Sequence, residues 1–157
     1  MTNIDVANGM VFQALGVKKD SFDIRKIFFW LIIRLLLQEM GIEIGYSYNW
    51  YIRGPYSPDL TTYIYDNLDM LKDHDFSAYK LSDTAKAAID AINGLEEAKP
   101  QTLSVVSWYE LLASVLYIIR KWNKENPYES LIKYKPKYTK TDYDAAMTQL
   151  RMIGCCQ

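Results

Sequence analysis

Histidine and cysteine are scarce in this chain of 157 residues, which has one histidine and two cysteines. The cysteines are the adjacent pair Cys155 and Cys156, which close no useful loop and are too few to complete a zinc site. His74 lies between Asp73 and Asp75 in a polar stretch, where neighbouring side chains usually point apart into solvent. We therefore expect no metal and no cofactor, and thiols that stay reduced in the cytoplasm.

Signatures of catalysis are also missing. The sequence contains neither the Gly-Lys-Ser/Thr of a phosphate-binding loop nor a Gly-X-Gly-X-X-Gly fingerprint. A nucleophile activated by histidine would depend on His74 alone. The carboxylates of Asp66 and Asp69 lie one turn apart, which a solvated acidic helix face explains without chemistry. These absences predict that the chain is not an enzyme.

Long apolar runs and an excess of one charge are absent as well. The most apolar stretch, residues 27–37, is interrupted by Arg34 and falls short of the roughly 20 residues of a membrane span, so we expect a buried helix there. The first residues show no basic stretch followed by an apolar run, so we expect no secretory signal there. With 18 Lys+Arg against 19 Asp+Glu, the chain has no strongly charged tail. Half of its residues are hydrophobic, which is enough for one domain over residues 1–157.

The apolar residues that are present follow mainly helical spacing. Residues 42–52 alternate apolar with polar side chains, as an extended strand does, and residues 79–81 are predicted as a second short strand. Capping residues and apolar periodicity predict helices elsewhere. These run from 24 to Gly41, from Ser57 to 71, from Ser82 to Gly94, from Ser104 (or a turn later, at Ser107) to Asn126, over one turn at 128–132, and from Thr139 or Thr141 to Gly154.

Tyrosine is abundant, with 13 Tyr against 5 Phe, and one concentration surrounds a Gly-Pro turn. This turn, with its neighbours, is a candidate partner-binding motif, made of Trp50, Arg53, Gly54, Pro55, Tyr56 and Ser57. A structural interpretation is sufficient, because Pro adds rigidity and Ser57 can cap the following helix. The alternative is that Arg53 and Tyr56 are exposed beside the helix start and contact an anion or a partner.

Two passages resemble known families. Residues 48–60 resemble the aromatic-X-Gly-Pro-Tyr-Ser-X-X-Leu signature of small prokaryotic proteins similar to Panacea-type domains, a group associated with antitoxins and mobile elements. Residues 79–86 are similar to the last strand and following helix of winged-helix domains, with Ala85 in place of the usual Gly. The resemblance covers residues 21–93 and implies a mainly α, winged-helix-like fold with minor short β-strands. Additional helices over 103–157 complete the expected architecture.

A second tyrosine concentration lies in a basic segment, residues 120–140, where cations outnumber Glu125 and Glu129. Cations interleaved with aromatic rings are typical of nucleic-acid surfaces, although a solvated surface explains them equally. The helix after Ser57 is acidic, which argues against reading DNA with that helix. The candidate nucleic-acid surface comprises Arg120, Lys121, Lys124, Lys133, Tyr134, Lys135, Lys137, Tyr138 and Lys140.

The sequence therefore predicts a non-enzymatic protein-interaction module, antitoxin-like or an accessory protein of a mobile element or defence system. The surplus of amphipathic tyrosines and the missing catalytic residues favour this interpretation. The alternative is a nucleic-acid-binding protein that uses the basic segment 120–140.

Overall fold

A computed structural model describes residues 2–14, 35–36, 38, 49–51, 54–122 and 125–155. The predictions of a central helix over 24–41 and of most of the strand over 42–52 lie outside these residues, as do Arg53 and Lys124. Leu35 and Leu36, from the predicted central helix, are helical and buried.

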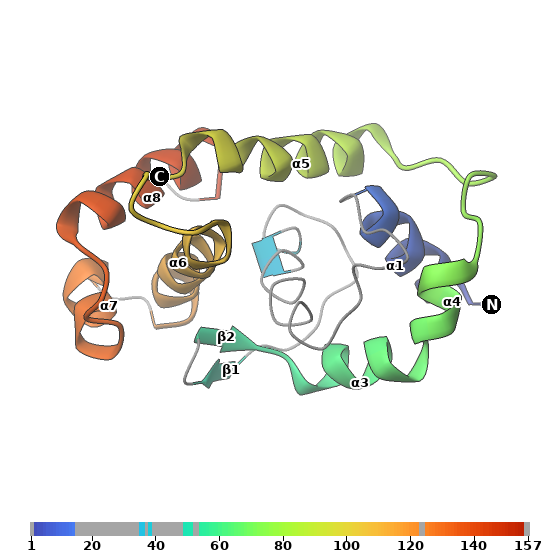
Figure 1. The fold of residues 1–157 in the computed structure, drawn as a ribbon, viewed down its shortest axis with the longest axis horizontal. Helices are drawn as coiled ribbons and strands as arrows, with labels where there is room; N and C mark the ends of the chain where they lie inside the picture. Colours follow the sequence, from blue (N-terminus) through green and yellow to red (C-terminus); the bar gives the residue numbers. More distant parts are fainter. Residues whose placement is uncertain are drawn as a thin grey trace.

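The fold is mainly helical, as predicted. The helices are α1 (Asn3–Ala14), α3 (Pro58–Asp66), α4 (Leu68–Asp73), α5 (Asp83–Gly94), α6 (Val105–Tyr117), α7 (Pro127–Tyr134) and α8 (Lys140–Met152). A 3-10 turn, Leu95–Ala98, follows α5, and a π-helical segment, Ile118–Trp122, continues α6. Figure 1 shows α6, α7 and α8 at one end of the long axis and α1 and α4 at the other. Among the described residues, no helix is both long and apolar enough to span a bilayer.

Polar side chains cap the starts of six described helices, four of them at positions that the sequence predicts. Each N-cap side chain accepts a hydrogen bond from a backbone N–H three residues on, which satisfies one free donor of the first turn. Ser104, and not Ser107, caps α6, and Thr139, and not Thr141, caps α8. Pro58 stands at the first turn of α3, as expected after a capping serine. In the described part of the chain, the predicted caps are Ser57, Ser82, Ser104 and Thr139, and the structure adds Thr2 and Asn126.

The only sheet in the described part of the chain is a two-stranded antiparallel ribbon. It joins β1 (Asn49–Tyr51) to β2 (Gly54–Tyr56), with Trp50 opposite Pro55. The Gly-Pro-Tyr sequence was expected to be a turn, and that prediction is wrong because these residues form β2. Pro55 lacks an N–H, which a two-stranded ribbon tolerates because each strand has one unpaired edge.

Three further predictions need correction. Residues 79–81 form no strand, because a turn in which Tyr79 N–H donates to the Phe76 carbonyl leads into them and no described strand pairs with them. The wing strand that the winged-helix resemblance implies is therefore missing. The expected single turn at 128–132 is the longer helix α7, because Asn126 caps it and Pro127 fits its first turn. The helix from Ser104 ends as an α-helix at Tyr117 and continues with π geometry.

Helix α6 is the centre of the described core, since every residue from Trp108 to Ile118 is buried. The indole N–H of Trp108 donates to the Leu95 carbonyl (2.8 Å), and the Tyr109 hydroxyl donates to the Ile92 carbonyl (2.6 Å). Both acceptors lie at the C-terminal end of α5, where carbonyls lack the regular helical partner, and the Ile92 carbonyl also accepts from Leu95 N–H. One cluster of buried hydrophobic residues extends from Val11 to Cys155.

Candidate functional site

Four aromatic rings from distant parts of the sequence meet beside α6. Trp50 of β1 lies 4.9 Å from Trp122, 5.7 Å from Tyr117 and 6.0 Å from Tyr134, measured between ring centroids. Trp122 and Tyr134 are themselves 5.3 Å apart. These tilted and edge-on geometries are the ones that aromatic pairs prefer. We call the four rings the junction cluster, because it joins the β-ribbon to α6 and α7.

The path of the chain places these rings. The ribbon packs on α6 through β2 and so carries Trp50 to the helix. At Ile118 the helix widens into the π-helical segment, which ends at Trp122. Such segments change the direction in which later side chains leave a helix and are frequent at functional sites. The chain restarts at α7 and brings Tyr134 back to the same place.

A buried ion pair lies next to the junction cluster. The ammonium group of Lys135 donates a hydrogen bond to Oε1 of Glu110 on α6, and both residues are buried. The Lys135 ammonium also lies 5.9 Å from the centre of the Trp50 ring. Lys137, which is exposed, approaches the second oxygen of Glu110 at 3.9 Å. Because an unpaired buried charge is costly, Glu110 and Lys135 hold each other in place.

Tyr138 fixes the same segment at a second point. Its hydroxyl donates to the carbonyl of Ser107 (3.0 Å), and its ring is buried beneath the ammonium group of Lys137 (4.9 Å). Burial, followed by the negative charges of Glu110 and Asp142, raises the pKa of the Tyr138 hydroxyl. The residues after α7 are therefore attached to α6 by an ion pair and a hydrogen bond.

Two hollows border the exposed ring of Tyr134. One, of about 450 Å³, lies between Trp122, Ser130, Lys133 and Tyr134. The other, of about 500 Å³, reaches the buried ion pair and is lined by Ser104, Val106, Ser107, Glu110, Tyr134, Lys135, Pro136 and Lys137. Tyr134, which borders both hollows, is 50% exposed, and Val106, which lines the second, is 47% exposed. Apolar surface is therefore accessible to a partner here. We call this region, with the exposed Lys133 and Lys137, the basic-aromatic face.

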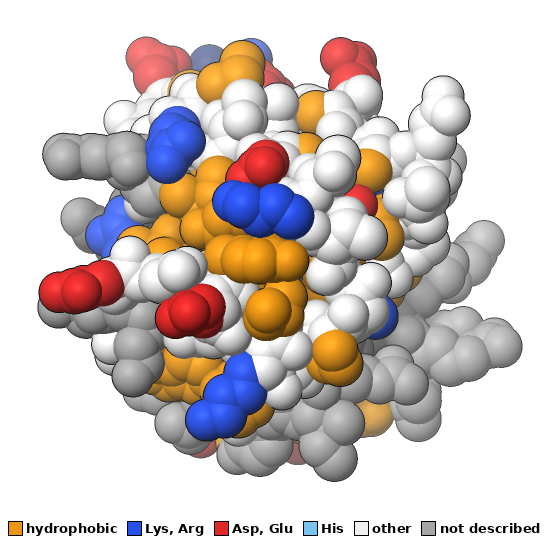
Figure 2. All heavy atoms as spheres, turned by 90° about the vertical axis from the view of Figure 1, so that its left-hand side faces the viewer, with side chains coloured by type: hydrophobic (Ala, Val, Ile, Leu, Met, Phe, Trp, Pro, Cys, Tyr) orange, Lys and Arg blue, Asp and Glu red, His pale blue; other side chains and the backbone are white. Residues whose placement is uncertain are grey.

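Several other cations of the segment are engaged within the molecule. Lys140 donates to Asp144 (2.8 Å) and lies over the rings of Tyr128 and Tyr143. The hydrogen bond to Asp144 is the largest cause of the raised pKa of Lys140. Arg120 donates to the carbonyl of Cys155. Figure 2 shows the end of the molecule that carries α7 and α8, where hydrophobic side chains gather among separate cations and anions.

The structure separates the nine residues of the predicted basic surface. Arg120, Lys121, Lys133, Tyr134, Lys137 and Lys140 are exposed. Lys135 and Tyr138 are buried, so the prediction that they lie on an open surface is wrong. The reason is tertiary, because Glu110 and the Ser107 carbonyl of α6 draw them inward. Lys124 lies outside the described residues.

The residues of the Gly-Pro motif likewise differ in burial and in role. Pro55 and Ser57 are buried, and Ser57 accepts a hydrogen bond from Leu60 N–H at the start of α3, so both have structural roles. Tyr56 is half-buried and packs against the core, while Gly54 opens β2. Trp50 is the one described motif residue in the junction cluster. Arg53 lies outside the described residues.

Glu110 is the residue of this region that the sequence analysis missed. It is the only charged residue between Trp108 and Ile119, in an otherwise apolar stretch of helix. A single carboxylate in such a stretch indicates a buried acid that needs a cation. That signal could have identified Glu110, although it does not name the partner.

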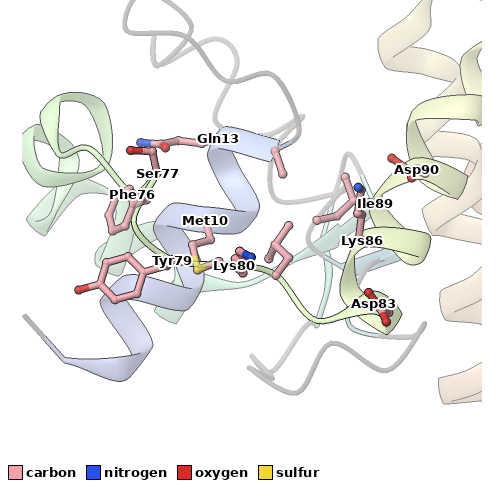
Figure 3. Close-up of a pocket in the computed structure, with 12 residues that line it drawn as sticks. Met10, Gln13, Phe76, Ser77, Tyr79, Lys80, Asp83, Lys86, Ile89 and Asp90 are labelled. Carbon is pink, nitrogen blue, oxygen red and sulfur yellow. The ribbon is translucent and has the colours of Figure 1, made fainter.

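A larger hollow, of about 600 Å³, lies where α1, residues 76–81 and α5 meet (Figure 3). Met10, Phe76 and Ile89 supply apolar surface, while the charged residues that border it, such as Lys86 and Asp90, are exposed. No described charged pair is buried there, in contrast to the hollow at Glu110. We therefore regard the basic-aromatic face as the stronger candidate site.

Metal chemistry finds no support in the described part of the chain, where no group of three or more His, Cys, Asp or Glu side chains is arranged to hold an ion. Comparisons with protein-family models, with curated proteins and with solved structures find no match for this chain. The candidate site therefore stands on its own geometry.

Proposed function

We propose that this protein is a protein-interaction module that binds an acidic, partly apolar segment of a partner at the basic-aromatic face. The observation that carries the proposal is the position of Tyr134. Its ring is half exposed between two hollows, yet it packs against Trp50 and Trp122 and lies beside the Glu110–Lys135 pair. A tyrosine held in this way loses little conformational entropy on binding, which is a property of interface hot spots.

The charge of the face favours carboxylates over a phosphate backbone. Nucleic-acid binding depends on several cations that neutralise phosphates. Here Lys135 is buried against Glu110, which Lys137 also approaches, and Lys140 is paired with Asp144. The positive charge left at the face suits one or two carboxylates of a peptide. An antitoxin-like or defence-associated role, implied by the resemblance of residues 48–60, remains part of the proposal.

Affinity capture with three baits tests this function. The wild-type chain is compared with Lys133→Ala/Tyr134→Ala and with Tyr79→Ala/Lys86→Ala, which removes the same kinds of exposed side chain from the larger hollow. We expect a protein recovered by the wild-type and control baits and lost by the face variant. The recovered protein, once purified, should bind the face variant at least about tenfold more weakly, a difference of about 1.4 kcal/mol. Equal recovery by all three baits would reject the face.

Nucleic-acid binding is the second candidate function. Its support is that the ammonium of Lys133 lies 5.5 Å from the centre of the exposed Tyr134 ring, so that a cation and a stacking ring lie side by side. An electrophoretic shift with random duplex and single strands tests it. Non-specific binders reach dissociation constants of roughly 10⁻⁴ to 10⁻⁶ M, so no shift at low salt with tens of micromolar protein would eliminate this function.

A further inference from the structure

The outer face of α3 and α4 carries negative charge around an exposed ring. Asp59, Asp66 and Asp69 are exposed, and Tyr65, the residue before Asp66, is 48% exposed. Asp59 and Asp66 are seven residues apart, so they lie on the same side of α3, about 10 Å apart along its axis. We call these four residues the acidic stripe. Lys72 is the only cation in the sequence of the two helices.

The acidic stripe and the basic-aromatic face are complementary in chemistry. Each presents a half-exposed tyrosine, Tyr65 or Tyr134, beside charges of one sign. The ammonium groups of Lys133 and Lys137 already lie near tyrosine rings of their own molecule, at 5.5 and 4.9 Å from the ring centres. A second ring and a row of carboxylates would add cation–π contacts and ion pairs to the same ammonium groups.

The two surfaces cannot meet within one molecule. In Figure 1, α7 lies at one end of the long axis, and α4 lies at the other with α3 next to it. Complementary patches on different sides of a chain form heterologous, head-to-tail contacts. The formal net charge of −1 also means that two copies approach without strong overall repulsion.

We propose that a second copy of this chain is a partner of the basic-aromatic face, and that its acidic stripe is the docking element. The inference rests on the proposed function, because it uses the same face, and it names the partner. Head-to-tail contacts leave one free face at each end, so association continues from dimers to longer assemblies or closes into rings. Exposed charges dominate the contact, so salt weakens it.

Sedimentation velocity over a concentration series tests the association. At an ionic strength of about 0.02 M, where the Debye length is roughly 20 Å, we expect the weight-average mass to rise with protein concentration. At about 0.5 M salt, where screening shortens the Debye length to roughly 4 Å, we expect a monomer. A wild-type chain that remains monomeric at low salt up to about 100 μM overturns the proposal.

Paired variants locate the contact. Asp66→Lys/Asp69→Lys reverses two of the three charges of the stripe. Lys133→Glu/Lys137→Gln removes the positive charges of the face without placing a carboxylate beside Glu110. Each variant alone should be monomeric at low salt. An equimolar mixture should form a 1:1 complex and nothing larger, because each variant retains one intact surface. Recovery in the mixture also shows that both variants are folded.

Matched charge changes elsewhere are the control. Asp90→Lys/Glu97→Lys and Lys80→Glu/Lys86→Gln alter exposed residues outside both surfaces and should associate like the wild type. If the control and stripe variants lose association equally, or if the mixture stays monomeric, the proposed contact is wrong. A monomeric chain whose capture of another protein still depends on Tyr134 overturns this inference and leaves the proposed function intact.

Discussion

Lys135 donates a hydrogen bond to Glu110 across 25 residues of sequence, and the two side chains are only 5% and 10% exposed. The pair attaches the segment after α7 to the central helix. It also removes the charge of one lysine from a segment in which the sequence places more cations than carboxylates. The preceding residue, Tyr134, is consequently held at a defined place beside Trp50 and Trp122.

Breaking this pair from one side should destabilise the fold. Glu110→Leu leaves the buried Lys135 ammonium without its counter-charge, at a cost of roughly 3–5 kcal/mol. Lys135→Met leaves Glu110 with only the more distant Lys137 and should cost less. The double variant Glu110→Leu/Lys135→Met removes both charges and should recover most of that loss. Urea unfolding of the three variants and the wild type measures the coupling energy. If the loss of unfolding free energy in the double variant equals the sum of the two single losses, the two side chains do not interact directly.

A second prediction concerns Gly9 in α1, which lies under the ring of Phe76. A Cβ at Gly9 would be 2.1 Å from the ring Cζ of buried Phe76, so the ring must shift to make room for it. Overpacking costs roughly 1–3 kcal/mol. The higher helix propensity of Ala returns about 1 kcal/mol, so we expect Gly9→Ala to be destabilised by up to about 2 kcal/mol.

Gly94 supplies the matched control for Gly9. It also lies in a helix, the last turn of α5, but an added Cβ would meet no atom within 4 Å. Gly94→Ala should therefore be neutral or slightly stabilised. Thermal unfolding of both variants checks the difference, and equal melting temperatures would argue against close packing of Phe76 on α1.

The start of α8 gives a third prediction. Thr139 accepts a hydrogen bond from Asp142 N–H, and the Asp142 carboxylate accepts one from Thr139 N–H, which is a capping box. Thr139→Ala should cost about 1 kcal/mol. Thr141→Ala, two residues on and exposed, should change the free energy of unfolding little. Chemical denaturation of the two variants distinguishes the caps. A larger loss of unfolding free energy in Thr141→Ala would show that Thr141, and not Thr139, caps α8.

The helix starts could be predicted from the sequence because capping depends on neighbours within one turn. Ser57, Ser82, Ser104 and Thr139 act as their local patterns indicate. The prediction of a strand at 79–81 failed because a strand needs a pairing partner, which the local sequence does not identify.

The candidate site was less predictable because its decisive contacts are distant in sequence. Lys135 has the same Lys-rich neighbours as exposed Lys133 and Lys137, and its buried hydrogen bond to Glu110 distinguishes it. The two tyrosine-rich segments were each recognised, but their meeting through Trp50 and Tyr134 depends on the path of α6 and α7.

Buried tyrosines make the fold sensitive to alkali, which is the fourth prediction. Burial, followed by the charge of Glu96, raises the pKa of Tyr109 to about 12. The ordinary value is about 10, so the unfolded chain releases this proton at a lower pH than the folded chain does. The stabilisation is complete below about pH 10 and is lost as the pH rises through about 12.

Denaturant midpoints across this alkaline range check the effect. The wild-type midpoint should fall with rising pH, and Tyr109→Phe should flatten that fall. The variant also loses the hydrogen bond to the Ile92 carbonyl, so its free energy of unfolding at neutral pH should be lower by about 1 kcal/mol. Tyr65→Phe, at an exposed position, should keep the wild-type slope. An unchanged slope in Tyr109→Phe would show that this tyrosine is not the titrating group.

The most direct test of the docking face is a lysine footprint. Purified chain, at a dilution where it is monomeric, and chain in an extract of its native host cells are treated with an amine-acetylating reagent and compared by mass spectrometry. We predict that Lys133 and Lys137 lose reactivity in the extract, that exposed Lys86 keeps it, and that buried Lys135 is unreactive in both. Unchanged reactivity of Lys133 and Lys137, with protection at Lys86 instead, would contradict the assignment of the basic-aromatic face.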